Sequence, residues 1–159
     1  MSMNGVEQDV HVLCITREIE IAAPIDTAFA AILEELGPGG ELPTGERFPM
    51  ILEAWPGGRW YRDLGDDAGH FWGHVQVIKP PRLLELIGPM FMSFPASNHV
   101  QYRLEPDGAG TLLRLTHRSM GPIPAEMRGR IGHGWEHRLG RIVEVAKRLA
   151  AEGREGAKR

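Results

Sequence analysis

The stretch Met127–Leu149, with the sequence MRGRIGHGWEHRLGRIVEVAKRL, carries one apolar stripe at helical spacing. The stripe residues follow one another at intervals of three or four: Met127, Ile131, Trp135, Leu139, Ile142, Ala146 and Leu149. This spacing places them on one face of an α-helix. The charged residues between them are predicted to face solvent: Arg128, Arg130, Glu136, Arg138, Arg141, Glu144, Lys147 and Arg148. A helix of about 23 residues is roughly 35 Å long, so the rest of the chain must supply a broad surface to cover the stripe.

The residues before this helix form short apolar segments that are typical of β-strands. The predicted strands cover residues 11–22, 50–55, 59–64, 70–79, 83–87, 98–105 and 111–118. One short helix, residues 26–36 with Asp26 as its N-cap, follows the first strand. Residues 37–49 are rich in glycine and proline and lack periodicity, which indicates a mobile loop or a lid.

This order of elements predicts an α+β fold in which a curved antiparallel sheet wraps around the C-terminal helix. A run of antiparallel strands followed by a helix places the helix on one face of the sheet. A twisted sheet with this many strands curls around its helix. With 159 residues, the chain is predicted to form one domain over residues 10–152, between a flexible tail at 1–9 and a frayed basic tail at 153–159.

Composition excludes several classes of function. The net charge is −3, and no basic cluster is interleaved with aromatic residues, so nucleic-acid binding is not expected. No apolar run approaches 18 residues, so no membrane span is predicted. The single cysteine, Cys14, is predicted to be a buried structural thiol and fits a reducing compartment. Since the first nine residues do not resemble a secretion signal, a cytoplasmic location is expected.

Four motifs, taken in order, resemble one known family. They are Pro56-Gly57-Gly58-Arg59-Trp60, then Gly73-His74-Val75 leading to Pro80-Pro81-Arg82-Leu83-Leu84, then Gly110-Thr111-Leu112-Leu113 ending in Thr116-His117, and lastly Gly134-Trp135 with Leu139. Over residues 15–150 this pattern resembles the activator-of-Hsp90-ATPase-homologue-1-like family of the START-like (helix-grip, Bet v 1-like) superfamily. The resemblance implies a sheet gripping the C-terminal helix, with a cavity between them. Residues 37–49 depart from the family, which more often has a second short helix with a tryptophan pair there.

The resemblance leaves three functions open. The first is non-enzymatic binding of a small hydrophobic or aromatic molecule, as in stand-alone members that resemble small-molecule binders. The second is a co-chaperone or other protein-interaction module, since the family's namesake stimulates a chaperone ATPase. The third is a cyclase- or hydrolase-like enzyme that uses the same cavity, because distant members of the superfamily are cyclases.

Two histidines of the helix, His133 and His137, have the i, i+4 spacing that can hold one metal ion. The zinc-protease pattern needs a glutamate directly after the first histidine, and Gly134 occupies that position. At about 100° per residue, both histidines lie about 160° from Trp135, so they are predicted to face solvent. The sequence predicts neither a metal nor a cofactor.

His117 continues the inward series of Leu113 and Leu115 on the last strand. It is predicted to be either a core histidine or a polar group that contacts a ligand. A general base would need a partner carboxylate, and the sequence identifies none. No catalytic residue is therefore predicted.

On the strand at 70–79, Phe71, Gly73 and Val75 are predicted to face the core, and His70 and Trp72 the outer surface. An outward Trp72 would cover a surface for association, which makes a homodimer through the sheet one prediction. Binding to a chaperone is the second protein interaction that the sequence leaves possible.

The predicted cavity is mostly apolar with a few polar tips. Its predicted lining is Phe29, Phe71, Val75, Leu86, Met90, Met92, Tyr102, Leu115, His117 and Trp135. Met90 and Met92 are placed at its mouth, since methionine adapts to irregular shapes. Tyr102 and His117 are expected to orient the ligand, and such a lining suits a hydrophobic or aromatic molecule.

Overall fold

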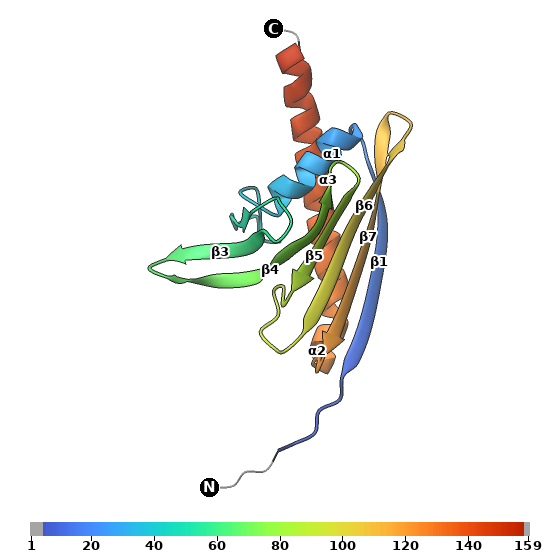
Figure 1. Cartoon of the computed structure of the whole chain (residues 1–159). Coiled ribbons are helices and arrows are strands. Elements are labelled where there is room, and N and C mark those ends of the chain that lie inside the picture. Colours follow the sequence, from blue (N-terminus) through green and yellow to red (C-terminus); the bar gives the residue numbers. More distant parts are fainter. Residues whose placement is uncertain (1–4, 158–159) are drawn as a thin grey trace.

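A seven-stranded antiparallel sheet curves around one long helix, α3, in the computed structural model of the chain (Figure 1). The structure describes residues 5–157. The strands follow the order β1-β7-β6-β5-β4-β3-β2 across the sheet. The elements are β1 (His11–Ile21), α1 (Ile25–Glu35), β2 (Ile51–Leu52), β3 (Arg59–Gly65), β4 (Ala68–Lys79), β5 (Leu83–Gly88), β6 (Ser97–Asp107), β7 (Gly110–Gly121), α2 (Ala125–Arg128) and α3 (Arg130–Ala157). The predicted α+β helix-grip fold is confirmed.

The apolar stripe of the C-terminal helix faces the sheet as predicted. Trp135, Leu139, Ile142 and Ala146 are buried. The helix is longer than predicted, because α3 continues to Ala157 through most of the segment expected to fray. Residues 158–159, and residues 1–4 of the expected N-terminal tail, lie outside the described part of the chain. No helix in the described part is long and apolar enough to cross a membrane.

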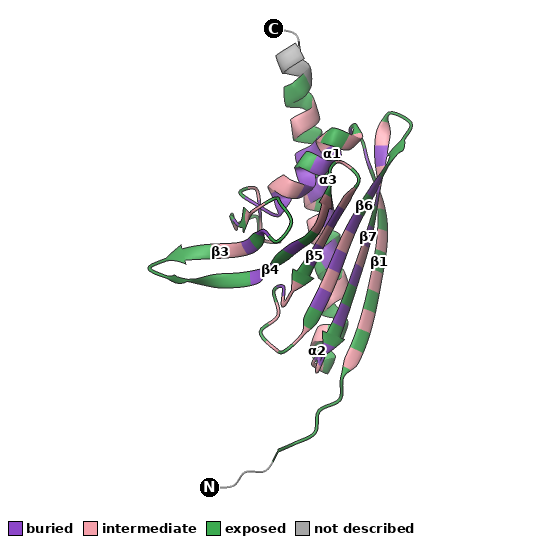
Figure 2. Ribbon diagram, viewed as in Figure 1, coloured by how far each residue is buried: buried purple, intermediate pink, exposed green. Residues whose placement is uncertain are grey.

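Buried residues alternate along β6 and β7, as a strand with one face on the core requires (Figure 2). The core continues onto α1, which packs against α3 where Glu35 pairs with Arg138 and Glu34 with Arg148. Helix α1 begins at Ile25 with Pro24 as its N-cap, so Asp26 lies in the first turn and the prediction that it caps the helix is wrong. Asp26 still places a negative charge at the positive end of the helix dipole.

The alternation in β4 is reversed around Trp72. Phe71 is 47% exposed, whereas Trp72 is buried. Trp60 of β3 pairs with Gly73 of β4. The next residue, Tyr61, pairs with Phe71, which leaves Trp72 as an extra residue in β4. An extra residue of this kind turns the side chains beyond it to the opposite face, so the predicted outward position of Trp72 is wrong. The prediction of a homodimer through the sheet therefore loses the residue on which it was based.

One further prediction, about Cys14, differs from the structure. Cys14 is exposed, not buried, because it lies on the outer face of the edge strand β1. Residues 37–49 contain local hydrogen bonding: Glu41 and Arg47 form an isolated β-bridge within the segment. The amide of Phe48 also donates a hydrogen bond to the Gly40 carbonyl at 2.8 Å.

Candidate functional site

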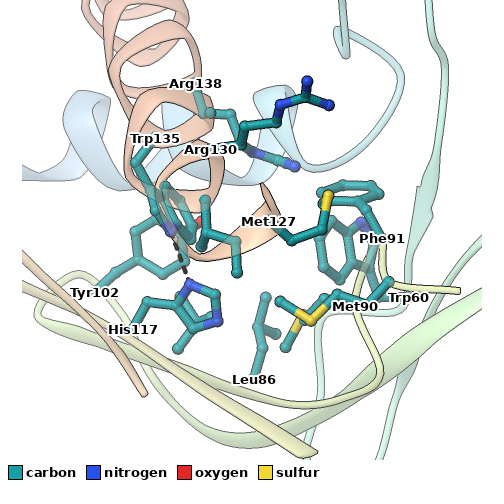
Figure 3. A pocket seen from close by; sticks show the side chains of 14 residues that line it. Trp60, Leu86, Met90, Phe91, Tyr102, His117, Met127, Arg130, Trp135 and Arg138 are labelled. Atoms are coloured by element: carbon teal, nitrogen blue, oxygen red, sulfur yellow. Dashed lines mark hydrogen bonds between the residues drawn. The ribbon is translucent and has the colours of Figure 1, made fainter. Parts of the chain in front are cut away.

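A cavity of about 180 Å³ lies between the N-terminal half of α3 and strands β5, β6 and β7 (Figure 3). Most of the side chains around it are aromatic, aliphatic or methionine. The lining residues are Trp60, Leu86, Met90, Phe91, Met92, Val100, Tyr102, His117, Met127, Arg130, Ile131, Gly134, Trp135 and Arg138. Concave apolar space with a small number of polar groups is typical of small-molecule sites.

The sheet and one loop position the floor of this cavity. Val100 of β6 pairs directly with His117 of β7, and directly opposed residues share a face of the sheet, so both side chains point at α3. Met90 is the second residue of the loop after β5 and has a φ of 58°, in the left-handed region that is rare for residues other than glycine. Its amide donates a hydrogen bond to the Trp72 carbonyl at 2.9 Å, which holds this conformation and keeps Met90 buried beside the cavity.

Six of the ten predicted residues line the cavity: Leu86, Met90, Met92, Tyr102, His117 and Trp135. The other four lie elsewhere. Phe29 is buried on α1 and does not border the cavity. Val75 and Leu115 are buried in the core without bordering the cavity. Phe71 is turned outward by the extra residue in β4, so its predicted inward position is a mistake of strand phase.

The residue that the sequence reasoning missed most clearly is Arg138, which is predicted to face solvent and instead lines the cavity. Its Nη2 lies 3.2 Å from a carboxylate oxygen of Glu35, and Glu35 is only 2% exposed. The guanidinium carbon also lies 4.6 Å from the ring centre of Phe91, 5.4 Å from Trp60 and 5.7 Å from Trp135. A buried charge is tolerated when it is paired, and aromatic faces add cation–π attraction.

Two sequence signals could have identified this pair. Arg138 is three residues after Trp135, which places it only about 60° away around the helix, on the flank of the stripe. Glu35 lies three and four residues after Ile32 and Ala31, so it falls on the apolar face of α1. A carboxylate on such a face needs a cation nearby when the face is buried.

A directed chain of hydrogen bonds fixes His117. The indole Nε1–H of Trp135 donates to Nδ1 of His117 at 2.9 Å, so the imidazole proton is on Nε2. Nε2 donates to Oδ1 of Asn98 at 2.7 Å. The Asn98 amide in turn donates to the carbonyls of Gly88 at 3.1 Å and Pro89 at 3.3 Å. Burial lowers the pKa of His117 to about 4, so the ring is neutral at physiological pH.

A second hollow, of about 600 Å³, adjoins the first between residues 37–49 and α3. The two hollows share Phe91, Gly134 and Arg138 as lining residues. His137 donates from Nε2 to the Glu41 carbonyl at 2.7 Å, which ties the loop to the helix. His137 is therefore half-buried, and the prediction that it faces solvent is wrong because the loop covers this side of α3.

His133, the other histidine of the predicted pair, is exposed as predicted. In the described part of the chain, no group of three or more His, Cys, Asp or Glu side chains is arranged to hold a metal ion.

Comparison with known proteins places this geometry in a family. The family model described as activator of Hsp90 ATPase homolog 1-like protein matches residues 45–147, more than half of the chain. No curated protein matches the chain.

Solved structures of low sequence identity share the fold. An uncharacterized protein from Rhizobium leguminosarum has a TM-score of 0.69 at 18% identity, with 90% of this chain and 99% of that chain covered. CalU16 from Micromonospora echinospora has a TM-score of 0.60 at 22% identity, with 92% and 91% covered. The di-domain ARO/CYC StfQ from the steffimycin biosynthetic pathway has a TM-score of 0.62 at 15% identity, with 91% of this chain and 52% of StfQ covered. At these identities the similarity concerns the fold.

Proposed function

The chain belongs to the activator-of-Hsp90-ATPase-homologue-1-like family, and we propose that it binds a small hydrophobic or aromatic molecule between the sheet and α3. The observation that supports this proposal is the cavity of about 180 Å³ and its mostly apolar lining. A domain whose only task is to present an outer surface to a partner has no need of such a space, because unfilled apolar space costs dispersion contacts.

The size of the cavity limits the ligand. An apolar cavity of about 150 Å³ in a protein core holds one benzene molecule, so this cavity suits a compound with one aromatic ring and a few further atoms. A longer ligand would extend past Phe91 and Arg138 into the adjoining hollow. The rings of Trp60, Phe91 and Trp135 offer flat surfaces for stacking with an aromatic ligand.

The state of His117 argues against the enzymatic alternative. StfQ, whose fold is similar, is an ARO/CYC protein, which makes a cyclase-like role the natural alternative. A general base must have a nitrogen available to the substrate and a pKa near the working pH. Both nitrogens of His117 are engaged, by Trp135 and Asn98, and burial lowers its pKa to about 4. Binding without catalysis therefore agrees better with this site.

We also propose a reducing, cytoplasmic setting. Cys14 is the only cysteine and is exposed, and an exposed unpaired thiol is stable where disulfides do not form.

A pair of glycine variants tests the binding proposal. A Cβ added at Gly134 or at Gly140 meets no atom within 4 Å, and both glycines lie in α3. Only Gly134 borders the cavity. Replacing either glycine by leucine should stabilise the helix by up to about 1 kcal/mol. Only Gly134→Leu should place a side chain in the space where the ligand binds.

The measurements are native mass spectrometry of the protein as purified and tryptophan fluorescence titrated with toluene and other apolar single-ring compounds. We expect saturable binding to the wild type and to Gly140→Leu, and at least tenfold weaker binding to Gly134→Leu. If the wild type binds none of these compounds, or if Gly134→Leu binds them as well as Gly140→Leu does, the proposal is wrong.

A further inference from the structure

Tyr102 carries a polar group that the protein itself leaves unsatisfied. Its side chain is fully buried, and its hydroxyl has no hydrogen-bond partner among the described residues. The ring borders the cavity, next to Trp135 with ring centres 6.0 Å apart (Figure 3). A buried hydroxyl without a partner is unfavourable, and most buried polar groups in proteins are paired. The unpaired hydroxyl therefore indicates that a molecule entering the cavity supplies its hydrogen-bond partner.

The charges around the cavity indicate what kind of atom that partner presents. Two arginines, Arg130 and Arg138, line the cavity, and no carboxylate does. Glu35 pairs with Arg138 from behind the lining, whereas Arg130 forms no ion pair in the part of the chain that the structure describes. The Nε–H of Arg138 is a second buried donor without a partner there. Donors and positive charge together favour a hydrogen-bond acceptor that is neutral or negative.

We propose that the ligand is a single-ring aromatic compound carrying an acceptor oxygen, and that the Tyr102 hydroxyl donates a hydrogen bond to that oxygen. This inference rests on the proposed function, because it assigns the ligand class of the same cavity. Burial raises the pKa of Tyr102, so its hydroxyl keeps the proton it donates at neutral pH. Carbonyl, phenolic and carboxylate oxygens share this acceptor chemistry, and the positive lining favours the charged form of the oxygen.

Two ligands of nearly the same shape test the role of Tyr102. Acetophenone carries a carbonyl oxygen where α-methylstyrene carries a methylene group. The chain has two tyrosines, and Tyr61 lies on β3 outside the cavity lining, so Tyr61→Phe is the matched control for Tyr102→Phe. Affinities are measured by calorimetry for the wild type and both variants.

We expect the wild type and Tyr61→Phe to bind acetophenone about fivefold more tightly than α-methylstyrene, the range of one net hydrogen bond. Tyr102→Phe should remove this difference and leave the affinity for α-methylstyrene unchanged. If both ligands bind equally to the wild type, or if Tyr102→Phe keeps the difference, the inference about the oxygen is wrong while the binding proposal stands. If neither ligand binds to the wild type, the binding proposal itself fails.

Benzoate tests the contribution of charge. Arg130→Gln and Lys147→Gln remove the same charge from α3, but only Arg130 borders the cavity. We expect Arg130→Gln to weaken benzoate binding about threefold or more and to leave acetophenone binding unchanged, whereas Lys147→Gln should change neither. Equal effects of the two variants would show that benzoate responds to the overall charge of α3 and not to Arg130 at the cavity. That result would overturn the proposed preference for a charged oxygen.

Discussion

The apolar stripe from Met127 to Leu149 has two halves with the same spacing but different surroundings. In the first half, Ile131 and Trp135 border the cavity. In the second half, Leu139, Ile142 and Ala146 are buried in a closed core. The stripe continues unchanged from one half to the other.

The difference arises from what lies opposite each half. Helix α1 packs against α3 and contributes Phe29 and Ile32 to the same buried core as Ile142. None of the residues that line the cavity beside the first half belongs to α1; the lining opposite α3 comes from the sheet, from α2 and from the loop that carries Met90. Helical spacing therefore predicts which side chains leave water, but whether they pack against atoms or border a void depends on an element elsewhere in the sequence.

The largest expected effect compares the two halves directly. Ile142 is fully buried, so Ile142→Ala should leave a hole in close-packed surroundings and lower the free energy of unfolding by about 4 kcal/mol. Ile131 is half-buried beside existing space, so Ile131→Ala should cost about 1 kcal/mol. Urea denaturation of both variants measures the two values. Equal losses would mean that the two halves are packed alike.

A smaller effect should come from pH. The pKa of His117 is about 4 in the folded protein, against an ordinary value of 6.5. The unfolded chain therefore takes up the proton first, and stability present above pH 6.5 should be lost as the pH falls from 6.5 towards 4. A shift of this size corresponds to at most about 3 kcal/mol.

Urea unfolding of the wild type and of His117→Gln between pH 7 and pH 4 isolates this contribution, because other groups titrate in both proteins. The loss of stability over this range should be up to about 3 kcal/mol smaller in His117→Gln. Parallel pH profiles would show that His117 is not buried as a neutral ring. The part of the cavity beside His117 would then be open to solvent.

Much of the fold could be predicted from the sequence because it rests on local patterns. The stripe of α3 and the alternation in β6 and β7 are periodic, and glycine and proline mark the turns. The phase of β4 could not be predicted, since the extra residue at Trp72 arises from pairing with β3. The exposure of Cys14 likewise depends on which strand lies at the edge of the sheet.

The candidate site could be predicted only in part, for the same reason. Strand alternation predicts that Tyr102 and His117 point at α3. Helical spacing indicates that Arg138 and Glu35 could each be buried, but it does not show that they pair, because the two residues are more than a hundred positions apart. Phe91 belongs to a loop without periodicity, so only the folded chain shows that it borders the cavity.

The smallest expected effect concerns the hydrogen bond between Trp135 of α3 and His117 of the sheet, beside the cavity. Trp135→Phe keeps an aromatic ring beside the cavity but removes the Nε1–H that donates to Nδ1 of His117 at 2.9 Å. Loss of one buried hydrogen bond should lower the free energy of unfolding by about 1 kcal/mol. It should also release the imidazole from its single tautomer, which ¹⁵N spectra of the His117 ring report. Trp55→Phe is the control, because Trp55 is 57% exposed and should affect neither measurement. If the His117 ring keeps one tautomer in Trp135→Phe, then Asn98 alone orients it, and the directional link between α3 and the sheet is weaker than the geometry indicates.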